Sequence, residues 1–263
     1  MNAAALALFS LVAVLGAGLS GYAAGAYFKR MSSDDAARAV RELFTSLAPD
    51  AGEETRTRQM LQLDILLSAA NVISLANVFN VVLVAWLLMR EDGDLTVFSW
   101  AFVIALMSIF HGAEVLVLSA KPISPERAQR KILRILRNVT IFGAVWGSAG
   151  FLFIDDIASR NSLVVLLALI GTAAGGAASM AVLPQASLAF VAAIGGPAFF
   201  RLLTMGDGEH AVVAAYQVSL IFVLGAVSHG VYDTVIRRAT VGEAAAAVQA
   251  PTAPRKAAGA TRA

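Results

Sequence analysis

The chain has 263 residues, of which 58% are hydrophobic and only 14% are charged, with a net charge of +2. Soluble globular domains carry about 25% charged residues, so this composition excludes an ordinary soluble domain and favours a protein that lies in a bilayer. There is no cysteine, which excludes disulfides and thiolate-bound metal or iron–sulfur sites.

Seven apolar runs each approach the length of about 20 residues that a helix needs to cross the hydrocarbon core. They predict an all-α, polytopic seven-helix bundle with spans at residues 3–28, 63–89, 97–119, 135–154, 163–183, 186–203 and 211–236. The first run is alternatively a cleaved secretory signal, which would leave six spans. An uncleaved anchor is favoured, because no positive charge precedes this run whereas Lys29 and Arg30 follow it.

The basic residues gather in alternate connecting segments. All of the 20 Lys and Arg except Arg90, Arg160 and Arg201 lie in residues 29–62, 120–138 and 237–263. By the positive-inside rule, the N-terminus is expected outside and the C-terminus in the cytoplasm of a bacterial inner membrane. Residues 237–263 are rich in alanine, proline and threonine and are expected to form a disordered tail.

Residues 29–62 form a cytoplasmic segment with an amphipathic pattern. Ser33 is a candidate helix cap, and Val40, Leu43, Phe44 and Leu47 recur at helical spacing. The pattern predicts a helix in the membrane interface, with docking of a partner as the alternative.

Polar residues recur at every third position of the span at 63–89, at Asn71, Ser74, Asn77 and Asn80. Residues at this interval drift around a helix, so we expect them to hydrogen-bond to more than one neighbouring span. A polar translocation path is the alternative.

Ionisable residues within or beside the spans are the candidate functional residues, because charge at membrane depth is costly. They are His111 and Glu114, three residues apart, His229 and Asp233, four residues apart, and Asp64. Structural pairing, proton or ligand sensing, and binding of a metal or haem remain open. No further ligand at a known spacing joins them, so we assign no metal, cofactor or catalytic residue.

A basic helix is predicted to begin at Ser124 and Pro125 and to continue directly into the span at 135–154. Its cations are expected to contact anionic lipid head groups, and they are Arg127, Arg130, Lys131, Arg134 and Arg137. No aromatic residues are interleaved with them, so we expect no nucleic-acid partner.

Small residues at GxxxG spacing predict close packing between spans. The pairs are Gly21 with Gly25, Gly143 with Gly147 next to Trp146, and Gly171 with Gly175. We expect the last pair, in the run "GTAAGGAASMAVLP" that Pro184 ends, to form the tightest packing seam.

From about residue 58 to 236, the chain resembles the integral-membrane sensor domains found N-terminal to diguanylate cyclase (GGDEF) and related cyclic di-GMP signalling modules. The resemblance is carried by "LQLDILLSAANVISLANVFNVVLVAWLL", "FGAVWGSAGFLF", "GTAAGGAASMAVLP" and "SLAFVAAIGGPAFFRLL". It implies a sensory or regulatory module of the bacterial inner membrane that acts by helix rearrangement on a cytoplasmic partner, or as a homo-oligomer.

This chain has no GGDEF or EAL sequence after its last span, so catalysis by the chain itself is not expected. Two other function classes remain open. One is a small transporter or channel-like protein that uses Asn71, Asn77, His111 and Glu114 as its path. The other is a membrane-embedded enzyme that uses the two histidine–carboxylate pairs.

Overall fold

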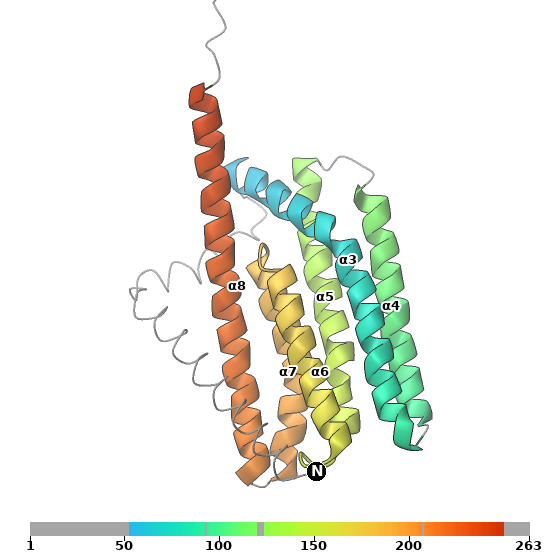
Figure 1. Ribbon diagram of the computed structural model, residues 1–263. Coiled ribbons are helices and arrows are strands. Elements are labelled where there is room, and N and C mark those ends of the chain that lie inside the picture. Colours follow the sequence, from blue (N-terminus) through green and yellow to red (C-terminus); the bar gives the residue numbers. More distant parts are fainter. Residues whose placement is uncertain (1–52, 93, 120–123, 207, 250–263) are drawn as a thin grey trace, which may run out of the picture.

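The computed structural model describes residues 53–92, 94–119, 124–206 and 208–249, and all regular structure within these ranges is helical. The helices run back and forth along one bundle (Figure 1). They are α3 (Glu53–Asp92), α4 (Leu95–Ser119), α5 (Pro125–Phe153), α6 (Arg160–Ser179), α7 (Pro184–Met205) and α8 (Gly208–Gln249). The expected first span at 3–28 with Gly21 and Gly25, and the amphipathic pattern after Ser33, lie outside the described residues.

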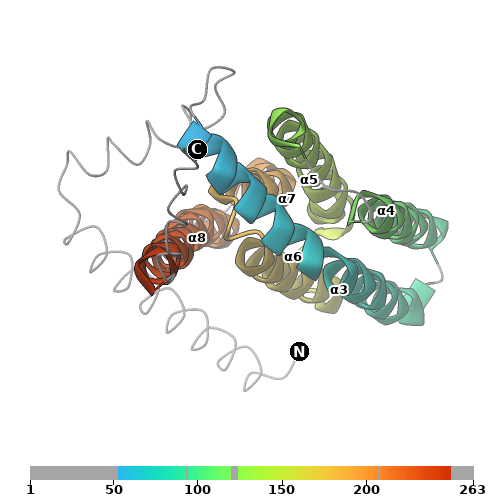
Figure 2. The same ribbon diagram turned by 90° about the horizontal axis from the view of Figure 1, so that it is seen from above.

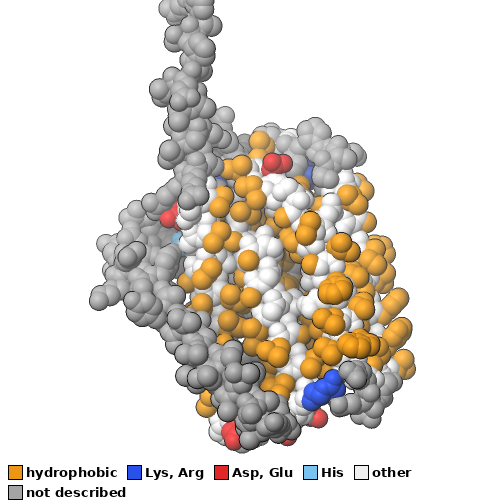
Figure 3. Space-filling model, in the orientation of Figure 1, with side chains coloured by type: hydrophobic (Ala, Val, Ile, Leu, Met, Phe, Trp, Pro, Cys, Tyr) orange, Lys and Arg blue, Asp and Glu red, His pale blue; other side chains and the backbone are white. Residues whose placement is uncertain are grey.

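The outer surface of the bundle is apolar. Val72, Leu75 and Phe79 on α3 are each at least 70% exposed, and Figure 3 shows hydrophobic side chains across the visible face, with charged ones near its two ends. Such a surface is unfavourable in water and matches lipid. All six helices contain a stretch long and apolar enough to cross a bilayer. These stretches correspond to the six spans predicted between residues 63 and 236.

Helices α5 and α7 pack closely because α5 presents glycines to its neighbour. A Cβ added at Gly147 would lie 2.6 Å from the carbonyl oxygen of Ile194, and one at Gly143 would lie 2.9 Å from that of Phe190. Gly150 lies outside the predicted GxxxG pairs but is packed in the same way, since a Cβ there would lie 2.5 Å from that of Ala198. The absence of side chains at these positions lets the two backbones approach.

Two tryptophans join α4 to α5 near the start of α4. Trp146 is fully buried, and its ring meets the ring of Trp100 edge-on, with centroids 5.3 Å apart. The indole N–H of Trp100 donates to the carbonyl of Val145 over 3.1 Å. Edge-to-face aromatic pairs add about 0.5–1.5 kcal/mol to the energy of burial, so this end of the α4–α5 contact is firmly held.

The loop before α6 contains a carboxylate surrounded by hydrogen-bond donors. Asp155 Oδ1 accepts hydrogen bonds from the hydroxyls of Ser159 (2.9 Å) and Ser162 (3.0 Å) and from the backbone N–H of Asp156 (2.8 Å). Partial burial acts to raise the pKa of Asp155, but these hydrogen bonds outweigh it and hold the pKa below its usual value. Ser159 also caps α6 by accepting from the N–H of Ser162.

The expected helix between Ser124 and the fourth span is confirmed, since α5 is continuous from Pro125 to Phe153.

The prediction for Pro184 is wrong in detail. Helix α6 ends at Ser179, a turn follows, and Pro184 begins α7 instead of ending the preceding span. Proline suits the first helical position, where its missing N–H has no intrahelical partner to lose.

Two helices are longer than predicted. Helix α3 begins at Glu53, within the segment expected to precede the span, and Figure 2 shows its first turns crossing the end of the bundle. Gln62 fixes this crossing by donating to the carbonyl of Val182 over 2.8 Å. Helix α8 continues to Gln249, into the expected disordered tail. Its last turns include "EAAAAVQ", and alanine is the best helix former.

Candidate functional site

A cavity of about 700 Å³ lies between α3, α4, α5 and α6. This volume is in the range typical of small-molecule sites. The cavity arises where α4 and α5 diverge: the tryptophan pair joins them near the start of α4, and beyond it α4 packs mainly against α3.

Gly171 and Gly175 form part of the cavity wall, which corrects the prediction that they make the tightest packing seam. A Cβ added at either position would meet nothing within 4 Å. The adjacent Gly176 makes the close contact instead, because a Cβ there would overlap the Phe190 ring of α7. Consecutive residues of an α-helix point about 100° apart, so packing Gly176 against α7 turns the GxxxG pair toward the cavity.

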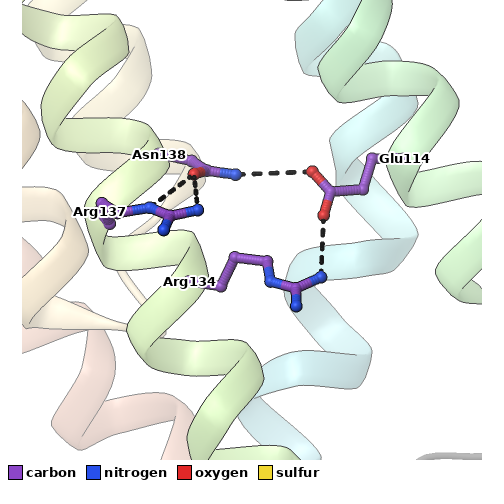
Figure 4. Close-up of polar contacts among 4 residues, drawn as sticks. All are labelled: Glu114, Arg134, Arg137 and Asn138. Atoms are coloured by element: carbon purple, nitrogen blue, oxygen red, sulfur yellow. Dashed lines mark hydrogen bonds and ion pairs between the residues drawn. The ribbon is translucent and has the colours of Figure 1, made fainter.

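A polar network lies on the α4–α5 side of the cavity (Figure 4). Glu114 Oε1 is 3.5 Å from a guanidinium nitrogen of Arg134, and Glu114 Oε2 accepts a 3.5 Å hydrogen bond from the side-chain amide of Asn138. The Asn138 carbonyl oxygen in turn accepts from Arg137 over 3.4 Å. These are long, partly exposed contacts, so each contributes little stability and the groups can exchange partners.

The structure separates the five cations that were predicted to contact lipid head groups. All four arginines are exposed, but Arg134 lines the cavity together with the less exposed Lys131, whereas Arg127, Arg130 and Arg137 do not. Lys131 is half-buried and forms no ion pair with any residue that the structure describes. The sequence pattern did not distinguish Lys131 from the other four cations.

Further polar groups line the cavity from α3 and α4. His111 and Asn77 are half-buried there. Ser74 is 8% exposed, and within the described residues its hydroxyl has no hydrogen-bond partner. A Cβ at Gly112 would lie 3.3 Å from that of Ser74. Ser74 therefore packs against α4 at a point two residues before Glu114. The charged part of the lining lies on α4 and α5, and uncharged polar residues of α3 extend along the wall from Ser74 to Asn80.

The polar residues at every third position of α3 point in different directions around the helix, as Asn80 and Asn71 show. The side-chain amide of Asn80 donates to the hydroxyl of Thr172 in α6 over 2.8 Å, which is an interhelical bond of the kind predicted. Asn71 is exposed and does not line the cavity. Asn77 and Asn80 both line the cavity with Ser74, whereas Asn71 is outside it, so the predicted path does not include all of its residues.

The five candidate ionisable residues do not converge on a single site. His111 and Glu114 line the cavity, whereas Asp64 is exposed and His229 stacks with Tyr232 of its own helix, α8. Asp233 also lies on α8, outside the cavity lining. Among the described residues, no three histidine or carboxylate side chains cluster as metal ligands.

The cavity wall is directly linked to α8. Gly176 of α6 and Phe190 of α7 line the cavity. The carbonyl of Ala177, which follows Gly176 in α6, accepts 3.3 Å hydrogen bonds from the hydroxyls of Ser187 in α7 and Ser228 in α8. The two hydroxyl oxygens are 2.7 Å apart, and both serines are at most 1% exposed. Three helices thus share one buried polar contact next to the cavity.

No known family model matches the chain, and comparison with curated proteins and with solved structures gives no significant match. The fold itself defines the class: a helical, multi-pass membrane protein with six apolar helices in the part that the structure describes. Its candidate site is a ligand-sized cavity with a partly polar wall and a hydrogen-bonded link to α8.

Proposed function

We propose that this chain is a sensory or regulatory module of the bacterial inner membrane. In this proposal the cavity receives the stimulus, and α8 transmits it to a cytoplasmic partner or to a second copy of the chain. The observation that carries the proposal is the shared wall: Gly176 and Phe190 line the cavity, and the adjacent carbonyl of Ala177 holds Ser228 of α8. The charge distribution between connecting segments supports a cytoplasmic C-terminus.

The proposed mechanism is a change in how α6, α7 and α8 pack. The Phe190 ring fits over Gly176 without space for a side chain, so an occupant that presses on this wall must displace the ring or α6 itself. Either displacement changes the position of the Ala177 carbonyl, which Ser187 and Ser228 both contact. Packed interfaces respond to such shifts by changing between discrete arrangements.

A cavity-filling variant tests this coupling without any ligand. Gly175→Leu would place a side chain in the cavity, where a Cβ has nothing within 4 Å. Gly196→Leu on α7 is the matched control, because its Cβ also meets nothing and it does not line the cavity.

The readout is the distance between spin labels at Leu133→Cys on α5 and Val231→Cys on α8, which are exposed positions in a chain without native cysteine. We expect Gly175→Leu to change the distance distribution and Gly196→Leu to leave it unchanged. Identical distributions in both variants, in protein that elutes normally, would refute the coupling.

A transport function is the second candidate, because Asn77, His111 and Glu114 of the predicted path line the same cavity. Its test is proton flux into liposomes, followed with a pH-sensitive dye. Saturable flux that Glu114→Gln abolishes would favour transport over sensing, and the absence of such flux would contradict transport.

A further inference from the structure

We infer that the cavity binds an anionic amphiphile, whose phosphate or carboxylate lies at Lys131 and Arg134 and whose apolar chain lies along α3, α4 and α6. This inference rests on the proposed function, because it names the class of ligand that would enter the same cavity. It is carried by the composition of the cavity wall, which has two cations on α5 and is mainly apolar along the rest of its length.

The charges in the cavity wall do not balance. Two cations, Lys131 and Arg134, line the cavity together with a single carboxylate, that of Glu114. Glu114 contacts Arg134 at 3.5 Å, and Lys131 has no ion pair within the described part of the chain. An ammonium group that lines a largely apolar cavity without a carboxylate partner favours an anion beside it. Such an anion would neutralise the ammonium group through charge-assisted hydrogen bonds.

A second, independent observation in the cavity wall is the buried hydroxyl of Ser74, which packs against Gly112, two residues before Glu114. It is 8% exposed, lines the cavity and has no hydrogen-bond partner among the described residues. Buried hydroxyls are normally paired, so an unpaired one indicates a missing acceptor. Phosphate and carboxylate oxygens are acceptors, and a hydroxyl can donate to them where Lys131 and Arg134 supply positive charge.

The remainder of the wall is suited to hydrocarbon. It includes Leu66, Ile73, Met107, Phe110, Phe142 and Leu167. The stretch of α5 in the wall, from Lys131 to Phe142, rises about 16 Å at 1.5 Å per residue. The cavity is therefore elongated along the bundle, and the bare backbone at Gly171 and Gly175 widens it. A compact polar anion would leave this apolar length unfilled, whereas an amphiphile fills it.

The test is equilibrium binding of radiolabelled hexadecyl phosphate to the purified full chain in an uncharged maltoside detergent. Hexadecanol, which has the same chain without charge, is the matched ligand control. We expect saturable binding of the phosphate and at least about tenfold weaker binding of the alcohol, because a hydrogen bond to a charged group is worth about that factor or more. Equal binding of the two compounds would overturn the inference.

Two variants distinguish binding in the cavity from non-specific electrostatic binding to the basic part of α5. Lys131→Gln is expected to weaken binding of hexadecyl phosphate about tenfold. Arg130→Gln is the matched control, because Arg130 is the exposed neighbour of Lys131 and does not line the cavity. It should change binding less than about twofold. Equal losses in the two variants would refute a cavity site, as would unchanged binding in Gly175→Leu.

Competition in nanodiscs distinguishes the two sources of such an anion. Displacement of hexadecyl phosphate by phosphatidylglycerol identifies a bilayer lipid, and its absence identifies a free single-chain amphiphile. The spin-label distances separate this inference from the proposed function. Specific binding without any change at α8 supports the ligand and refutes the sensory role. A change at α8 in Gly175→Leu without binding of hexadecyl phosphate refutes the ligand alone.

Discussion

Replacing single glycines by alanine should have opposite effects at two GxxxG pairs that look alike in the sequence. In Gly147→Ala the new methyl group would lie 2.6 Å and 2.7 Å from the carbonyl oxygens of Ile194 and Ala193. These are backbone atoms, so no side chain can rotate away and α5 must move from α7. In Gly175→Ala the methyl group meets nothing within 4 Å.

The expected magnitudes follow from these contacts. Overpacking a close interface costs about 1–3 kcal/mol, and Gly147→Ala should lower the free energy of unfolding by this amount. Gly175→Ala has no such cost and gains up to about 1 kcal/mol of helix propensity. The two variants should therefore differ by about 1–4 kcal/mol.

Reversible unfolding in mixed micelles of maltoside and SDS, followed by circular dichroism, measures this difference. Gly143→Ala serves as a second packed position, since its Cβ would lie 2.9 Å from the carbonyl oxygen of Phe190. If Gly175→Ala destabilised the protein as much as Gly147→Ala, then Gly175 would be at a close helix contact and the cavity wall would be incorrectly assigned.

Three further outcomes are expected. First, the low pKa of Asp155 means that its hydrogen bonds contribute fully above the ordinary value of 3.8 and are lost as the pH falls through the lower pKa of the folded state. Asp155→Asn should remove this acid-limb dependence from pH-dependent melting curves. Second, a double-mutant cycle of Ser187→Ala and Ser228→Ala should give a coupling of about 0.5–1.5 kcal/mol, and additive effects would contradict the shared contact. Third, Gly206→Ala should lower the melting temperature by the equivalent of about 1–2 kcal/mol, because Gly206 has φ of +79°.

The spans and the continuous basic helix of α5 could be predicted because both depend on local sequence. A run of apolar residues fixes a membrane helix by length alone, and Ser124 with Pro125 marks a helix start without reference to neighbours. The helix ends were less predictable. Most residues from Glu53 to Gln62, and the alanines after Gly242, are good helix formers. No local signal therefore makes α3 begin, or α8 end, at the edge of its apolar run.

Which cations of α5 line the cavity could not be predicted from the sequence. Lys131 and Arg134 line the cavity, whereas Arg130 and Arg137 do not. Arg134 is three residues from both Lys131 and Arg137 and four from Arg130, so the spacing alone does not indicate which of these cations meet the other helices. Asn138 could have been found, because it lies four residues after Arg134 and seven after Lys131, on the same face.

The cavity itself could not be predicted, because a cavity depends on side chains that are missing between helices. The same GxxxG spacing gives close packing at Gly143 and Gly147 and an open wall at Gly171 and Gly175. Phe190 decides between the two results: its backbone carbonyl faces Gly143, and its ring covers Gly176. With that ring seated on Gly176, the face of α6 that carries Gly171 and Gly175 is turned toward α3 and α5. A smaller residue at position 190 would remove the constraint that orients this face and links the cavity to α8.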